Sequence, residues 1–169
     1  MSSFATSYIP TTSAAVTRTA DQASMTGTNF SSWYNQAQGT IYCEFTQRLG
    51  AAGAVISATS SILVGNDANT RFVYMAQGAS NLSMYDGTNI TAVSAGGVSN
   101  TPIKYAIALN PTTAYACTNG LTVYSGAFTK ASSTIQLTLS QSGTINGTFK
   151  KITYYATALP SAVLQALTS

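Results

Sequence analysis

Apolar and polar residues alternate with a period of two along most of the chain, and this alternation constrains the fold more than any other feature. In PIKYAIALN (102–110), every second residue from Ile103 to Leu109 is large and apolar. A β-strand sends successive side chains to opposite faces, so such a stretch is expected to form a half-buried strand. We expect further strands at 40–46, 54–59, 71–76, 81–86, 89–95, 114–118, 121–126, 133–141 and 149–156.

Short turn sequences separate these stretches. Asp86-Gly87, Asn119-Gly120 and Asn146-Gly147 are typical hairpin dipeptides, because both central positions of a type I′ turn need a positive φ. About ten short strands joined by such turns favour an all-β sandwich or barrel.

The two ends of the chain follow other patterns. In ALPSAVLQALTS (158–169), Leu159, Val163 and Leu167 recur at helical spacing, with Pro160 in the first turn. This predicts one short C-terminal helix docked by that stripe. Residues 1–30 are rich in Ser and Thr and are expected to form an extended N-terminal arm or edge strand, leaving 31–169 as a single β-sandwich domain.

Charge is scarce, at 7% of the residues against a usual value of roughly 25%. A surface of hydroxyls and amides suits subunits that pack against neighbours. The seven basic residues are scattered in the sequence, and the adjacent pair Lys150 and Lys151 is expected to point to opposite faces of its strand. We therefore expect no nucleic-acid binding. No membrane insertion is expected either, because no apolar run approaches about 18 residues.

The two cysteines, Cys43 and Cys117, each lie in a predicted strand. We expect buried free thiols that act as small apolar residues. A disulfide between them is the alternative.

Catalysis is not expected. The chain has no histidine, which excludes Ser-His-Asp and Cys-His nucleophilic sites. Hydrolysis by paired carboxylates needs two acids beside one bond, whereas the four acids are Asp21, Glu44, Asp67 and Asp86, with no two on one predicted strand. Glu44 is expected on the non-core face as a solvated or interface carboxylate.

Ligand binding has a few candidates. The oxygen-rich stretch at Asn66 and Asp67 is the place to consider Ca²⁺, although one Asp is too few for a usual calcium site and an Asx-stabilised turn is favoured. No other cofactor is expected. Tyr42, on the outer face by strand parity, and Tyr85 with Asp86, beside a turn, are the candidate sugar contacts, together with Tyr154 or Tyr155.

Three stretches resemble a known family. They are SYIPTTSAAVTRTAD (7–21), NFSSWYNQAQGTIYCEF (29–45) and FKKITYYATALPSAVLQALT (149–168). Together they resemble a domain of tail fibres, tail spikes and related virion proteins of tailed phages, which has a concanavalin A-like (laminin G-like) jelly-roll sandwich. The resemblance covers both ends of the chain. Members often carry Glu at the place of Gln38 and more Arg near Lys150, and these departures weaken the expectation of an anionic ligand.

The resemblance also bears on the aromatic pair Trp33 and Tyr34. Members are expected to bind different receptors, so an aromatic pair that they share is expected to serve the fold. We expect Trp33 to pack under a sheet edge or against the C-terminal helix. A sugar-binding platform is the alternative.

The resemblance implies a non-enzymatic phage virion protein that binds a host receptor or glycan, as part of a tail fibre or spike. A capsid decoration (cement) or head-fibre protein is the alternative, and a polysaccharide depolymerase is a remote one. We expect a homotrimer that contacts other virion proteins, is assembled in the bacterial cytoplasm and leaves by lysis within the virion, because the N-terminus does not read as a signal peptide.

Overall fold

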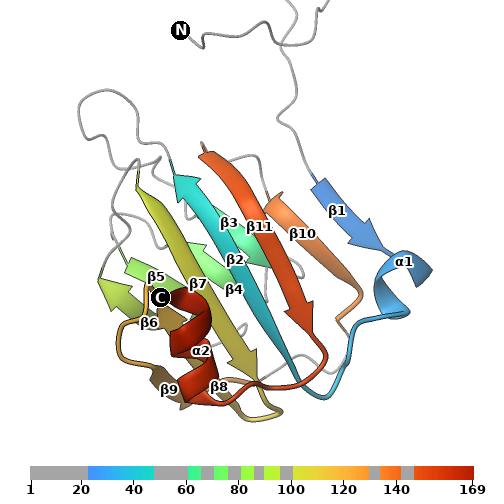
Figure 1. The fold of residues 1–169 in the computed structure, drawn as a ribbon. Helices are drawn as coiled ribbons and strands as arrows, with labels where there is room; N and C mark the ends of the chain where they lie inside the picture. Colours follow the sequence, from blue (N-terminus) through green and yellow to red (C-terminus); the bar gives the residue numbers. More distant parts are fainter. Residues whose placement is uncertain are drawn as a thin grey trace, which may run out of the picture.

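The computed structural model describes residues 23–47, 61–65, 71–75, 81–85, 90–95, 101–129, 134–141 and 147–169. In these ranges the strands form two sheets in which every recorded pairing is antiparallel (Figure 1). The first sheet contains, in spatial order, β1 (Ala23–Thr26), β10 (Gln136–Gln141), β3 (Ser61–Gly65), β4 (Arg71–Met75), β5 (Asn81–Tyr85) and β6 (Ile90–Ala95). The second contains β11 (Gly147–Tyr155), β2 (Gly39–Gln47), β7 (Pro102–Leu109), β8 (Thr113–Thr118) and β9 (Tyr124–Ala127).

Two helices accompany the sheets in the described ranges. A single turn, α1 (Thr28–Ser31), links β1 to the segment before β2. The C-terminal helix α2 (Ser161–Thr168) lies on the outer face of the five-stranded sheet (Figure 1). The predicted antiparallel β-sandwich with one short C-terminal helix is confirmed, and α1 is an addition that the residue pattern did not indicate.

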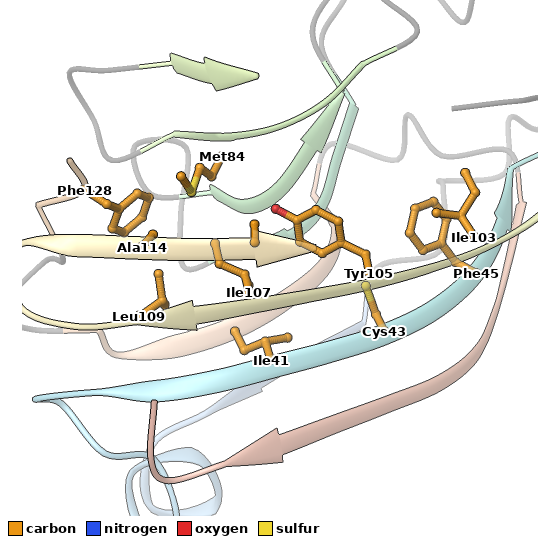
Figure 2. Packing of buried hydrophobic residues seen from close by; sticks show 11 residues of the cluster. Ile41, Cys43, Phe45, Met84, Ile103, Tyr105, Ile107, Leu109, Ala114 and Phe128 are labelled. Atoms are coloured by element: carbon orange, nitrogen blue, oxygen red, sulfur yellow. The ribbon is translucent and has the colours of Figure 1, made fainter. Parts of the chain in front are cut away.

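The main core lies on the inner face of the five-stranded sheet. Figure 2 shows the side chains that form it. As parity predicted, alternate residues of β2 and β7 point inward, and Met84 of β5 meets them from the other sheet. The buried set is Ile41, Cys43, Phe45, Met84, Ile103, Tyr105, Ile107, Leu109, Ala114, Ala116 and Phe128.

The outer face of β7 departs from the expectation of a half-buried strand. Ala106 and Ala108 point away from the main core, yet both are fully buried. They lie in a second apolar cluster with Cys117 of β8 and Leu164 of α2. Because α2 covers this part of the sheet, β7 is buried on both faces.

The docking face of α2 also differs from the predicted stripe. Leu164 and Thr168 are the buried residues of the helix, whereas Val163 is 39% exposed. Leu159 and Leu167 are partly buried beside the second cluster. Pro160 is the N-cap residue and not part of the first turn. The apolar spacing predicted the wrong docking face because one of the buried positions of the helix holds a threonine, Thr168.

Thr168 is accepted in this buried position because its hydroxyl is satisfied. The Thr168 oxygen accepts a hydrogen bond from the backbone N–H of Gly120 at 3.0 Å and lies 2.9 Å from the Leu164 carbonyl oxygen, to which it can donate. A buried hydroxyl without such partners would cost free energy. The polar end of α2 is therefore fixed to the β8–β9 turn.

That turn has the predicted geometry. Asn119 and Gly120 have φ values of 48° and 69°, and the backbone N–H of Leu121 donates to the Thr118 carbonyl at 2.9 Å. Positive φ at both central positions is the requirement that an Asn-Gly dipeptide meets. The turns predicted at 86–87 and 146–147, and the strand predicted at 54–59, lie at least partly outside the described residues.

The two cysteines lie on opposite faces of the same sheet. Cys43 is buried in the main core and Cys117 in the cluster beneath α2, and both are free thiols. Burial raises the pKa of the Cys43 thiol above its ordinary value. The expectation of buried free thiols is confirmed.

The segment before residue 31 is described only from Ala23 onward. Ala23–Thr26 forms the edge strand β1, paired with β10, and Phe30 is fully buried. These residues therefore join the sandwich. The arm predicted at 1–30 lies mostly outside the described residues, and its division from 31–169 stays a prediction.

In the part of the chain that the structure describes, neither helix combines the length and apolarity that a membrane crossing requires.

The packing of α2 leads to a first prediction. Leu164→Ala removes the fully buried anchor of the helix and is expected to lower the free energy of unfolding by about 2–4 kcal/mol. Val163→Ala, on the exposed side of the same turn, should change it by less than about 1 kcal/mol. Denaturant unfolding of both variants measures this. The reverse order would mean that α2 docks through the stripe containing Val163.

Candidate binding surface

Tyr42 was the first predicted sugar contact. It lies on the outer face of β2, as parity indicated, but its side chain is only 6% exposed. It belongs to the cluster beneath α2, with Leu164 buried and Tyr155 partly buried there. The expectation that Tyr42 is exposed on this face is wrong, because the C-terminal segment covers this part of the sheet. A ligand-binding role for Tyr42 stays an untested prediction.

The other predicted contacts cannot be placed with their side chains. Tyr85 is the last residue of β5, and its backbone alone is described. Asn66, Asp67 and Asp86 lie outside the described residues, so the sugar and Ca²⁺ predictions there stay predictions. Among the residues described, no three metal-binding side chains gather.

Trp33 lies at an edge of the five-stranded sheet. Its ring is 5.0 Å from the ring of Tyr154, measured between centroids, and Tyr154 belongs to the edge strand β11. Phe30 and Tyr34 stack at 4.5 Å, and Tyr34 stacks on Tyr154 at 5.3 Å. Burial raises the pKa of Tyr34 to about 12. Packing of Trp33 at a sheet edge is confirmed, and its partner is β11 and not the C-terminal helix.

The polar groups that follow Trp33 serve the same contact. The backbone N–H of Asn35 donates to the Tyr154 hydroxyl at 2.8 Å, and the Asn35 side chain donates to the Ala156 carbonyl at 2.8 Å. Gln36 exchanges two hydrogen bonds with the backbone of Thr134, at 2.6 and 3.0 Å. A Cβ on Gly39 would lie 2.7 Å from the Tyr154 hydroxyl, so the close approach requires glycine. The segment 33–39 therefore fastens α1 to β11.

A different surface gathers charge. Between Phe149 and Lys151 the pairing of β11 with β2 shifts by one residue, at a β-bulge. The bulge turns Lys150 toward the outer face, where its ammonium lies 2.8 Å from Glu44. Lys151 is opposite Glu44 on the same face and lies over the Tyr42 ring, 5.8 Å from its centroid. The expectation that Lys150 and Lys151 point to opposite faces is wrong, because the extra residue breaks the alternation.

The register extends this group across three strands. Glu44 of β2 is paired with Lys151 of β11 on one side and with Lys104 of β7 on the other. The hydrogen bond with Glu44, and the charge of that carboxylate, raise the pKa of Lys150. Lys104 donates to the carbonyl oxygen of Ser169, just beyond α2. Every charged residue whose side chain the structure describes belongs to this group: Glu44, Lys104, Lys150 and Lys151.

The sheet beside α2 is left open. The helix contacts β7 and β8, and Figure 1 shows β2 and β11 beside it without such a cover. The Lys150 side chain is 76% exposed and that of Glu44 is 12% exposed. We define the outer strip as the outward residues of β2 and β11 beyond Tyr42, namely Glu44, Thr46, Thr148, Lys150, Lys151 and Thr153. It offers ammonium, carboxylate and hydroxyl groups on the outer face of two paired strands.

The contact between segment 33–39 and β11 leads to a second prediction. Tyr154→Phe removes the acceptor of the Asn35 N–H and is expected to lower the free energy of unfolding by about 1–3 kcal/mol. Tyr105→Phe is the control, since the buried Tyr105 hydroxyl has no hydrogen-bond partner in the described ranges. This control should leave stability unchanged or raised. Thermal and denaturant unfolding compare the two, and equal losses would contradict the assigned role of Tyr154.

Comparisons with protein-family models and with curated proteins found no match. Solved structures do match. The CBM40 of the Ruminococcus gnavus IT-sialidase, bound to α2,3-sialyllactose, is similar with a TM-score of 0.60 and 16% identity, over 83% of this chain and 88% of that one.

Two toxin domains are also similar. The binding domain of Botulinum Neurotoxin DC in complex with SialylT has a TM-score of 0.60 and 11% identity over 86% of this chain. The binding domain of Paraclostridial Mosquitocidal Protein 1 has a TM-score of 0.57 and 16% identity over 78%. The match spans 38% and 36% of those two chains. These likenesses show that the chain has the lectin-like, jelly-roll β-sandwich fold.

Proposed function

We propose that this chain is a non-enzymatic binding domain that recognises a glycan on a host cell surface. The observation that carries the proposal is the lectin-like sandwich with an open polar strip beside its C-terminal helix. The similar solved structures include a CBM40 bound to sialyllactose and a toxin binding domain in complex with SialylT. The same fold thus occurs in proteins of very different sequence that were solved with such ligands.

The charge of the described residues supports binding over hydrolysis. Glu44 is the sole carboxylate whose side chain is described, and it is paired with Lys150 at 2.8 Å. A glycoside hydrolase of the usual kind needs two carboxyl groups on either side of the scissile bond. Glu44 has no such counterpart in the described ranges, which supports the non-enzymatic reading over a depolymerase.

The setting we propose is a bacteriophage particle, with the domain displayed on a tail fibre or spike. This part rests on the resemblance of the stretches 7–21, 29–45 and 149–168 to phage virion domains. Host-cell recognition is the task that a glycan-binding domain would perform there.

A capsid decoration protein is the second candidate, favoured by the edge strand β1. All four residues of β1 are exposed and none is charged, and Met25 is 43% exposed. The edge strand β11 instead carries two lysines and a bulge, which are common protections against pairing between sheets. An uncharged edge suits contact with another subunit, and we propose that a homotrimer or a capsid contact uses β1.

Glycan-array binding of the purified full chain tests the proposal. We expect binding to a subset of host-surface glycans and to intact host cells. Absence of both, together with co-purification with phage heads in numbers that match the capsid lattice, would contradict host recognition and favour decoration.

A further inference from the structure

The open strip carries a more specific inference, which rests on the proposed glycan binding. We propose that the outer strip binds the acidic group of an anionic glycan, a carboxylate or a sulfate, through Lys150 and Lys151. The site is formed by the β-bulge in β11, which places the side chains of two successive lysines on one face.

The β-bulge in β11 brings both lysines to the same face of the sheet. In a regular strand one of two successive lysines would face the core, which is costly for a charge. The shift between Phe149 and Lys151 instead brings both lysines to the outer face, opposite the single residue Glu44. Bulges often re-aim side chains beside functional sites. Two ammonium groups from neighbouring residues match the two or three oxygens of a carboxylate or sulfate.

The positive charge of the outer strip is only partly neutralised by Glu44. Glu44 is paired with Lys150, and Lys104 donates to the Ser169 carbonyl oxygen. Lys151 has no carboxylate partner among the described residues and lies over the Tyr42 ring. A cation over an aromatic face is held by the ring quadrupole. The strip therefore keeps an excess positive charge, from two lysines against one glutamate, in a chain of which only 7% is charged.

Threonine hydroxyls lie on both sides of the two lysines in the outer strip. Thr46 pairs with Thr148 at one end of the strip, and Thr153 pairs with Tyr42 at the other. Threonine hydroxyls donate and accept, as the hydroxyls of a sugar ring require. Nucleic-acid binding usually needs a longer basic stripe that follows the phosphates. A short cationic pair between hydroxyls fits one acidic sugar better.

A plain structural role competes with this proposal. Lysines and bulges on an edge strand can serve only to prevent pairing with another sheet. The two roles differ in what is lost on substitution. If the lysines only protect the edge, variants without them should self-associate and keep their ligand affinity. If the lysines form a binding site, the variants should bind the ligand more weakly while they stay folded and keep their assembly state.

The experiment measures the affinity of the full chain for 3′-sialyllactose, 3′-sulfated lactose and lactose by calorimetry or NMR titration. The variants are Lys150→Gln, Lys151→Gln and the double substitution. Lys104→Gln is the matched control, because it removes the same charge from a neighbouring strand whose lysine contacts the end of α2. Circular dichroism and light scattering record folding and assembly.

We expect the wild type to bind at least one acidic probe more tightly than lactose, and to bind it more weakly as salt is raised. The double variant should bind that probe about tenfold or more weakly, as expected for the loss of a charge-assisted hydrogen bond. Its affinity for lactose, and the affinity of Lys104→Gln for all three probes, should change less than about threefold. The preferred acidic probe identifies the carboxylate or the sulfate.

The outcomes separate the two proposals. If lactose and the acidic probes bind equally and the double variant binds as the wild type does, glycan binding stands and the lysine site is overturned. Self-association of the double variant with unchanged affinity would assign the lysines to edge protection. Failure of the wild type to bind any array glycan would overturn both. A single-stranded oligonucleotide is titrated in the same way, and tighter, lysine-dependent binding of it would overturn the glycan assignment.

Discussion

The burial of β7 on both faces is the constraint on which the rest of the structure depends. Tyr105, Ile107 and Leu109 face the main core, while Ala106 and Ala108 lie beneath α2. The two alanines matter because small side chains let the helix approach the sheet closely. The backbone N–H and C=O groups of a strand covered on both faces have no access to water, so their hydrogen-bond partners must come from the neighbouring strands. For β7 these neighbours are β2 and β8, and the three strands form the centre of the domain.

The position of α2 then determines which part of the outer face of the five-stranded sheet is open to a ligand. By covering β7 and β8 the helix removes Tyr42 and Cys117 from the surface. It leaves the outer side of β2 and β11 beyond Tyr42 open, and the bulge directs charge there. The aromatic segment at Trp33 fastens the opposite side of β11 to α1. The strand β11 thus carries Tyr154 on its inner face and the lysines on its outer face, where Tyr155 packs in the cluster beneath α2.

Strand parity predicted a large part of the fold. It placed Ile41, Cys43 and Phe45 of β2 correctly in the core, because a period of two has a direct geometric meaning. Strand parity failed where the position of a side chain depends on contacts with other strands or helices. The bulge at Lys150 arises from pairing with β2 and leaves no mark in the local residue pattern. The burial of Tyr42 depends on a helix more than 100 residues later in the chain. The role of Thr168 depends on the backbone of Gly120.

Native-state hydrogen exchange of the full chain tests the central claim most directly. If β7 is the doubly covered centre, the amides of Tyr105–Leu109 exchange only through global unfolding, with the free energy measured by denaturant. The amides of α2 and of the edge strand β11 then exchange faster, through local opening. Exchange of the β7 amides at the rate of α2 would contradict the account, because it would mean that the helix and the strand beneath it open together without unfolding the sandwich.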